Sequence, residues 1–134
     1  MLIVGGIGIT PFRSMIKYLL DKNERRDITL FYSNKTASEI AYKDVLEEAS
    51  QSGIKIINAL TTSNEYGENI NDDGMVFRNG RISQEMIAKE APDYAERVFY
   101  VSGPGSMVTA FGGTLKDLGV RDSRIKTDFF PGFA

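Results

Sequence analysis

The 134-residue sequence contains no histidine and no cysteine. The absence of histidine excludes Ser-His-Asp triads, Cys-His pairs and histidine-ligated zinc. The absence of cysteine excludes disulfides, thiolate catalysis and cysteine-ligated iron–sulfur clusters. Acid–base chemistry would therefore need a carboxylate, a lysine or a tyrosine. Hydride chemistry needs none of these groups, because its reacting atoms belong to cofactors.

The sequence also has little excess of charge and no long apolar run. It has 16 basic and 18 acidic residues, so its net charge does not favour nucleic acid or an anionic membrane as a partner. The apolar runs are too short to span a bilayer, and no signal peptide is visible. With 42% apolar and 25% charged residues, the chain is typical of one globular domain, which we expect to be cytoplasmic.

What the sequence does have is a glycine-rich turn at 5–11, directly after the short apolar strand 2–5. We expect Thr10 to cap a helix whose first residue is Pro11. Such a turn brings backbone N–H groups and a helix N-terminus to an anion, usually a nucleotide phosphate, although an ordinary strand–helix turn explains it equally well. Because a central strand rarely opens a complete enzyme, we also expect the sequence to be a piece of something larger.

The spacing of apolar residues predicts alternating strands and helices. Residues 63–81 are polar and are interpreted as a long irregular loop. The alternation predicts a parallel sheet with helices on both faces, whose ligands bind at the carboxyl ends of the strands. Strands are expected at 2–5, 27–34, 54–62, 97–102 and from 124, and helices at 11–22, 39–52, 83–91 and from Gly105 to Gly119.

Four spaced segments carry the chemistry. The first is not the dinucleotide fingerprint Gly-x-Gly-x-x-Gly, and no P-loop Gly-Lys-Ser/Thr is present. The segments are Gly-Gly-Ile-Gly-Ile-Thr-Pro-Phe-Arg-Ser at 5–14, Tyr-Ser-Asn-Lys-Thr at 32–36 with Glu-Ile-Ala-Tyr at 39–42, Ser-Gly-Pro at 102–104 with Met-Val at 107–108, and Thr-Asp-Phe-Phe-Pro-Gly-Phe at 127–133. Together they resemble the pyridine-nucleotide half of the ferredoxin–NADP reductase superfamily, which includes cytochrome b5 reductase, flavohaemoglobin reductase domains and oxygenase reductases.

The resemblance implies both a fold and a function. The fold is a three-layer, doubly wound α/β domain over 1–134, with a five-stranded parallel sheet of order 3-2-1-4-5. The function is to position the nicotinamide of NAD or NADP for hydride transfer to a flavin. The family's flavin domain, with its Arg-x-Tyr-Ser/Thr signature, is absent from this sequence. FAD or FMN is therefore expected only through a missing domain or subunit, and the isolated chain is expected to be inactive.

The resemblance also implies roles for individual residues. Ser102 would lie near the nicotinamide carbon that gives up hydride, while Asp128 and Phe130 would approach the flavin. For Phe130, simple packing of the tail onto the core is an equally open alternative. The residues expected to bind the cofactor are Gly5, Gly6, Gly8, Thr10, Pro11, Ser33, Lys35, Gly103, Pro104 and Met107.

Several alternatives stay open. Lys35 could serve the 2′-phosphate of NADPH or be an ordinary solvated lysine, so the choice between NADH and NADPH is undecided. Surface roles are the first interpretation of Arg78 and Arg81, with contact to a nucleotide phosphate as the second. Tyr42 falls on the apolar face of the second helix, where it packs or stacks on adenine. No metal site is expected.

The rival function is a non-catalytic nucleotide-binding or regulatory module. A doubly wound domain with an unrelated ligand is the third interpretation. The sequence leaves the electron acceptor and the oligomeric state undetermined.

Overall fold

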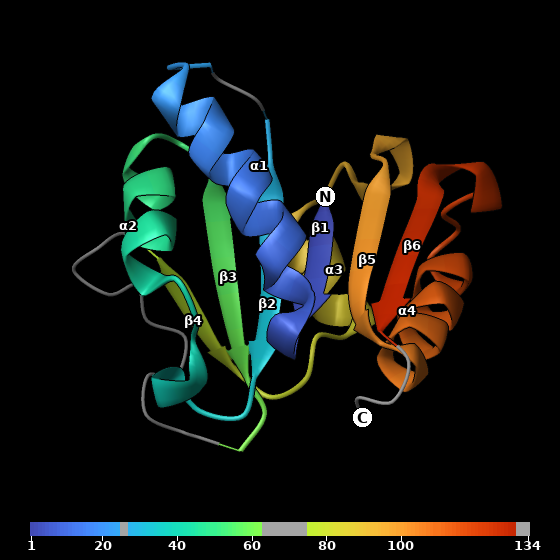
Figure 1. The fold of residues 1–134 in the computed structure, drawn as a ribbon. Coiled ribbons are helices and arrows are strands. Elements are labelled where there is room, and N and C mark those ends of the chain that lie inside the picture. Colours follow the sequence, from blue (N-terminus) through green and yellow to red (C-terminus); the bar gives the residue numbers. More distant parts are fainter. Residues whose placement is uncertain (25–26, 63–74, 131–134) are drawn as a thin grey trace.

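Six parallel strands form one sheet in a computed structural model, in the order β4-β3-β2-β1-β5-β6 (Figure 1). The structure describes residues 1–24, 27–62 and 75–130, and the side chains within them except those of Ile7, Ala37 and 128–130. The strands are β1 (Leu2–Gly5), β2 (Thr29–Asn34), β3 (Lys55–Leu60), β4 (Val76–Asn79), β5 (Phe99–Pro104) and β6 (Ile125–Phe130). The helices are α1 (Ile9–Asp21), α2 (Lys43–Gln51), α3 (Gln84–Glu90) and α4 (Gly105–Asp117).

Helices cover both faces of the sheet, α1 and α2 on the front and α3 and α4 on the back in the view of Figure 1. Successive strand residues point to opposite faces, so each strand contributes to two apolar clusters. In β1, Leu2 and Val4 belong to the front cluster, with Ile16 of α1 and Leu46 of α2. Ile3 belongs to the back cluster, together with Phe31, Phe99 and Leu115. The central strands are therefore buried on both faces, as parallel strands usually are.

The predicted fold class is confirmed, but the predicted strand count is wrong. The expected order 3-2-1-4-5 corresponds to β3-β2-β1-β5-β6. A sixth strand, β4, pairs with β3 at the sheet edge, within the stretch that the sequence predicted as a loop. Its Val76 and Phe77 are buried on opposite faces of the sheet. The polar composition of 63–74, which lies outside the described residues, concealed this short strand.

Two predicted helix starts are also wrong. Helix α1 begins at Ile9 after a 3-10 turn at Gly6–Gly8, so Thr10 lies inside the first turn and caps nothing. Tyr42 has a φ of 55°, in the left-handed region, and this conformation delays α2 until Lys43. The Tyr42 side chain is 38% exposed, with the Arg13 guanidinium 5.3 Å from its ring centroid. It therefore stacks on a cation at the surface and does not pack into the core.

Among the described residues, the front of β5 and β6 has no helix over it (Figure 1). Right-handed crossovers from β4 to β5 and from β5 to β6 place α3 and α4 on the back, which leaves the front side of these strands bare. Tyr100 of β5 is 46% exposed there, whereas its neighbour Phe99 is fully buried on the back. Tyr100 pairs in register with Lys126 of β6, which is also exposed. We call Tyr100 and Lys126 the bare face.

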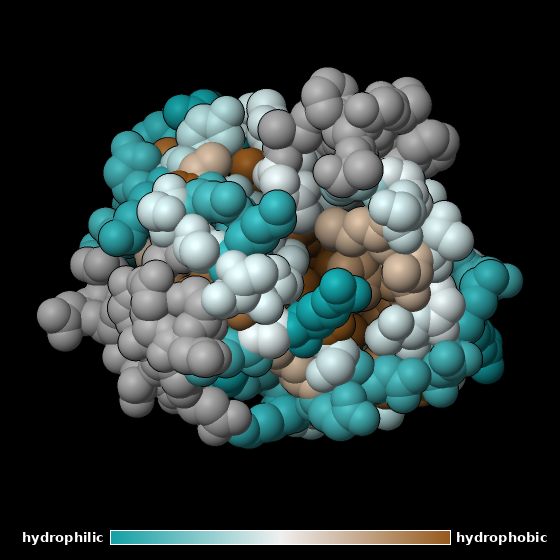
Figure 2. Space-filling model, turned by 90° about the horizontal axis from the view of Figure 1, so that it is seen from below, coloured by the Kyte–Doolittle hydropathy of each residue, from teal (hydrophilic) through white to brown (hydrophobic). Residues whose placement is uncertain are grey.

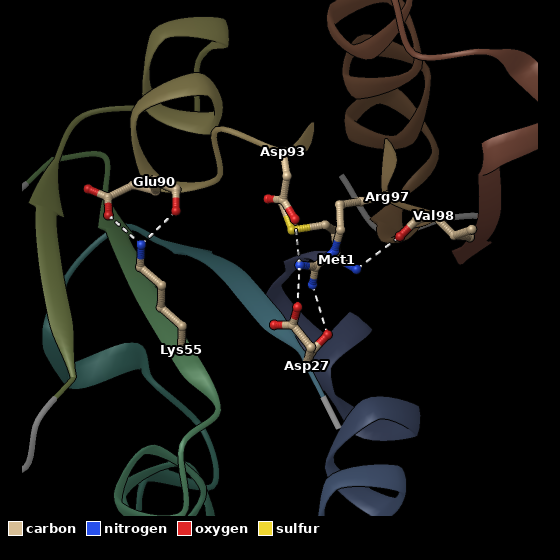
Figure 3. Close-up of polar contacts among 7 residues, drawn as sticks. All are labelled: Met1, Asp27, Lys55, Glu90, Asp93, Arg97 and Val98. Carbon is tan, nitrogen blue, oxygen red and sulfur yellow. Dashed lines mark hydrogen bonds and ion pairs between the residues drawn. The ribbon is translucent and has the colours of Figure 1, made fainter. Parts of the chain in front are cut away.

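Ion pairs join the strands and helices at the opposite, amino edge of the sheet (Figure 3). Glu90, the last residue of α3, is 8% exposed in its side chain and pairs with Arg78 at 2.8 Å and with Lys55 at 3.1 Å. The Lys55 ammonium also donates to the Glu90 carbonyl oxygen at 2.6 Å. Burial raises the pKa of Glu90, but the hydrogen bonds and charges of Lys55 and Arg78 outweigh it, so that the pKa falls below its ordinary value.

A second set of contacts at this edge holds the ends of β1, β2 and β5 together (Figure 3). The Arg97 guanidinium donates to the Asp27 carboxylate at 2.9 Å, to the Asp27 carbonyl oxygen at 2.8 Å and to the Asp93 carboxylate at 3.2 Å. The backbone nitrogen of Met1 donates to the Val98 carbonyl oxygen at 2.9 Å. These contacts are structural, because the strand carboxyl ends lie at the other edge. In the described part of the chain, no helix is long and apolar enough to cross a membrane.

Candidate functional site

The glycine-rich turn and the end of β5 are in direct backbone contact at the carboxyl edge. A Cβ atom on Gly8 would lie 2.5 Å from the Ser102 carbonyl oxygen and 3.0 Å from the Gly103 nitrogen. No side chain fits in that space, so only glycine lets the turn approach β5 this closely. The sequence assigned Gly8 to cofactor binding. The structure gives it a packing role, which joins two of the predicted site segments.

Met107 of α4 lies against the carboxyl ends of the adjacent strands β1 and β5. A Cβ atom on Gly5 would overlap the Met107 sulfur, and a Cβ atom on Gly103 would lie 3.0 Å from it. Both glycines therefore leave room for this thioether. Gly5, Gly103 and Met107, predicted separately from two motifs, lie together.

Ser102 occupies the middle of this arrangement. It pairs in register with Val4 of β1 on one side and with Asp128 of β6 on the other. The residue is fully buried, and its hydroxyl has no hydrogen-bond partner among the described residues. Buried hydroxyls are usually satisfied, so an unsatisfied one beside a candidate site calls for an explanation, such as a ligand. The side chains of Asp128 and Phe130 lie outside the described part of the chain.

Helices α1, α2 and α4 begin at this edge without a side-chain cap, and α1 and α4 start beside the predicted site segments. Helix α1 is preceded by Gly8 and helix α4 by Pro104, and neither residue supplies a capping hydrogen bond. The first N–H groups of such helices, with the positive end of the helix dipole, favour an anion. Gly6 is exposed, has a φ of 55° and has open space where a side chain would stand. Thr10 and Pro11 are exposed in the first turn of α1. The edge therefore offers backbone donors suited to a phosphate.

A groove of about 570 Å³ extends along the same edge on the back of the sheet. Its volume lies within the usual range for small-molecule sites. The carboxyl-edge view in Figure 2 shows a hollow with an apolar floor. The groove is lined by the hydroxyls of Ser33, Thr61, Ser106 and Thr114, by Arg81, and by the apolar residues Ile82, Met107, Ala110 and Phe111.

The structure brings most of the predicted residues together but not all. Ser33 and Met107 line the groove. Gly5 and Gly103 lie against Met107, and Gly8 lies against the backbone at the end of β5. Lys35 lies beyond the end of β2 and does not line it. Its backbone N–H donates to Glu39 at 3.1 Å, and its carbonyl oxygen accepts from the Thr62 hydroxyl at 3.0 Å. A larger cavity of about 620 Å³, between α4 and β6, contains none of the predicted residues.

Sequence reasoning gave too little weight to Arg81 and missed Thr61 and Phe111 as groove residues. The parallel topology places the residues that follow β3 and β4 at the same edge as Ser33. Recognising β4 would therefore have pointed to Arg81. The position of Phe111 follows from the periodicity of α4, which predicts its inner face but not which part of that face borders a groove.

Comparisons with known proteins give the family and the fold. The family model described as oxidoreductase NAD-binding domain matches residues 2–112. NADH-cytochrome b5 reductase 2-A of Vanderwaltozyma polyspora is 35% identical over 121 residues, which cover 86% of this chain and 38% of that protein. A flavohemoprotein of Rhodopirellula baltica is 25% identical over 130 residues, 97% of this chain and 31% of the relative.

A solved structure has the same fold. It is the FAD/NAD-binding domain of nitric oxide dioxygenase from Vibrio cholerae, with a TM-score of 0.76 at 22% identity, over 96% of this chain and 49% of that one. The chain spans about a third of the length of the curated relatives it matches.

Proposed function

The chain belongs to the oxidoreductase NAD-binding domain family, and from this membership we propose that it holds NADH or NADPH at the carboxyl edge of the sheet and presents the nicotinamide to a flavin carried elsewhere. The observation that carries the proposal is the contact of the Gly6–Gly8 turn with Ser102 and Gly103. It joins the segment suited to a pyrophosphate with the segment suited to the nicotinamide.

The chain's own contribution is orientation. Backbone N–H groups at the start of α1 bind the pyrophosphate, and Gly6 leaves that approach open. The groove beside Ser33 and Thr61 takes the adenosine half. Nicotinamide supplies the hydride and flavin accepts it. Because the nicotinamide and flavin rings would be held in a fixed relative orientation, the bimolecular hydride transfer becomes effectively unimolecular.

Ser102 is proposed as the residue that positions the nicotinamide. Its hydroxyl is buried and unsatisfied among the described residues, so it is available to a ligand that reaches the end of β5. Thr10 and Pro11, exposed on the other side of the same contact, would border the ring. Asp128 and Phe130 remain proposed neighbours of the flavin, on the strength of the family pattern alone.

The partner in this proposal is a flavin-binding domain or subunit. Support comes from the relatives, whose chains are two to three times longer and which include flavohemoproteins and NADH-cytochrome b5 reductases. The solved structure described above is an FAD/NAD-binding domain, and this chain covers about half of it. We therefore expect the purified chain to be colourless and to leave NAD(P)H unoxidised.

Binding of ADP-ribose to the purified chain tests the proposal. Gly6→Ala should weaken binding about tenfold, because it strains a left-handed turn and crowds the phosphate approach. Gly53→Ala is the matched control, since Gly53 also has a positive φ with open space but lies beyond the end of α2. Titration calorimetry measures both variants. Absence of ADP-ribose binding in the parent chain, or equal binding by the parent and Gly6→Ala, would contradict the proposed site.

A further inference from the structure

We propose that the groove takes the 2′-phosphorylated nucleotide, NADPH, and that Arg81 contacts its 2′-phosphate. This inference rests on the proposed function and adds the identity of the nucleotide. The relatives named above include an NADH-cytochrome b5 reductase, so family membership alone does not lead to it.

Arg81 reaches the groove because of the turn that ends β4. Gly80 has a φ of 99° and donates its N–H to the Leu60 carbonyl oxygen at 2.8 Å. This bond holds the turn against the end of β3 and brings Arg81 beside Thr61. Arg81 is exposed and forms no ion pair with any described residue. Its guanidinium is therefore available to an anion.

The arginine that precedes this turn, Arg78 of β4, has a different role. Arg78 pairs with the Glu90 carboxylate at 2.8 Å and donates to the Phe77 carbonyl oxygen at 3.0 Å. It lines a separate cavity, together with residues of α3. Of the two arginines that flank Gly80, one stabilises the fold and the other is left for a ligand.

The charges around the groove favour a phosphate over a free ribose diol. A protein that binds the 2′- and 3′-hydroxyls of NADH commonly does so with a carboxylate, whereas arginine suits the 2′-phosphate of NADPH. None of the described residues that line the groove is acidic. Glu39, the acid that follows β2, accepts a hydrogen bond from the Lys35 backbone and does not line the groove.

The hydroxyls near Arg81 complete a phosphate-binding set. Ser33 is the second-to-last residue of β2, and Thr61 follows β3, so both border the groove from adjacent strands. Each can donate to a phosphate oxygen while the guanidinium supplies the charge. Lys35, the other cation considered from the sequence, lies outside the groove lining.

Titration calorimetry with two probes tests the inference. ADP-ribose and its 2′-phosphate differ only in the phosphate, so the ratio of their dissociation constants isolates it. The 2′-phosphate should bind at least about tenfold tighter to the parent chain, since one charge-assisted hydrogen bond contributes that much. Arg81→Gln should remove most of this advantage and change ADP-ribose binding by less than about twofold.

Lys22→Gln is the matched control, because it removes one positive charge at the far end of α1. It should leave both affinities unchanged. Equal or tighter binding of ADP-ribose by the parent chain would overturn the inference, and so would an unchanged ratio in Arg81→Gln. If neither probe binds, the proposed function itself fails. Arg81 is exposed, so the melting temperature of its variant should match that of the parent.

Discussion

Ser102 is a single residue whose buried hydroxyl lowers the stability of the folded chain. Its hydroxyl is fully buried between β1 and β6, without a hydrogen-bond partner among the described residues. A buried unsatisfied polar group costs about 1–3 kcal/mol. The cost is explained if the hydroxyl is kept for a ligand.

Replacing Ser102 should therefore separate stability from rate. In the isolated chain, Ser102→Ala should raise the free energy of unfolding by about 1 kcal/mol, because the unsatisfied group is removed. In a reductase completed with its flavin domain, the same change should lower kcat more than it alters KM, since an orienting contact acts mainly in the transition state. Urea denaturation and steady-state kinetics give the two values. A destabilised variant with unchanged kcat would show that Ser102 only fills space.

The contribution of single glycines was only partly predictable from the sequence. The sequence predicted Gly5 and Gly8 as cofactor-binding residues, and that role stays a prediction. The physical reason for glycine at these positions, contact with Met107 and with the Ser102 backbone, depends on residues almost a hundred positions away. Spacing along the chain carries no information about such contacts. The place of Arg81 in the groove could not be read from the sequence for the same reason, because its neighbours come from β2, β3 and α4.

At the scale of elements, Glu90 holds α3 to β3 and β4. Glu90→Gln should lower the free energy of unfolding at pH 7 by about 1–3 kcal/mol, because Arg78 and Lys55 lose a charged partner. The folded-state pKa of Glu90 lies below its ordinary value of 4.5, so its stabilisation is present above that pH and is lost as the pH falls through the folded-state pKa.

Urea denaturation at pH 7 and at pH 3.5 measures this effect. The difference between parent and variant should be large at the higher pH and should shrink at the lower one. Glu48→Gln, an exposed change on α2, is the control and should have little effect at either pH. A difference that does not depend on pH would show that Glu90 acts through packing and not through its charge.

Helix α4 carries two glycines in its interior. Apart from the chain neighbours and the backbone of the helix itself, no atom lies within 4 Å of the place where a Cβ atom of Gly112 or Gly113 would stand. Gly113→Ala should therefore stabilise the chain by about 0.5–1 kcal/mol, since alanine loses less backbone entropy in a helix. Thermal melting measures the gain. A loss of stability would show that α4 needs the flexibility of glycine at this point.

The elements themselves were largely predictable. Periodicity identified four helices and five of six strands, because their apolar positions follow the faces that are buried. Periodicity did not predict the start of α2, because the left-handed backbone of Tyr42 leaves no trace in the pattern of apolar residues. It also failed at β4, where four residues between polar segments are too few to show a period.

On the scale of the whole molecule, the sheet is covered unevenly. The bare face leaves one side of β5 and β6 without a helix among the described residues, although parallel strands are usually buried on both faces. Tyr100 is exposed beside the edge strand β6, and the edge of a sheet is where copies of a chain can pair.

Two neighbouring residues of β5 test this asymmetry. Phe99→Ala should lower the free energy of unfolding by about 3–5 kcal/mol, because Phe99 is fully buried on the back. Tyr100→Thr should change it by about 1 kcal/mol or less and should reduce association at high protein concentration. Thermal melts and light scattering give the two readouts. Equal losses of stability would mean that the front of β5 is as well packed as the back.

The position of β1 also constrains when the molecule can take shape during synthesis. β1 lies between β2 and β5, so Leu2 pairs with both Leu30 and Tyr100. Of the strands in this sheet, the ribosome makes β1 before the others, yet one of its two edges stays unpaired until β5 has emerged. The contact between Gly8 and Ser102 must wait equally long. Such distant pairing slows folding and exposes a strand edge to other nascent chains, so the proposed nucleotide site is among the last parts of this domain to form.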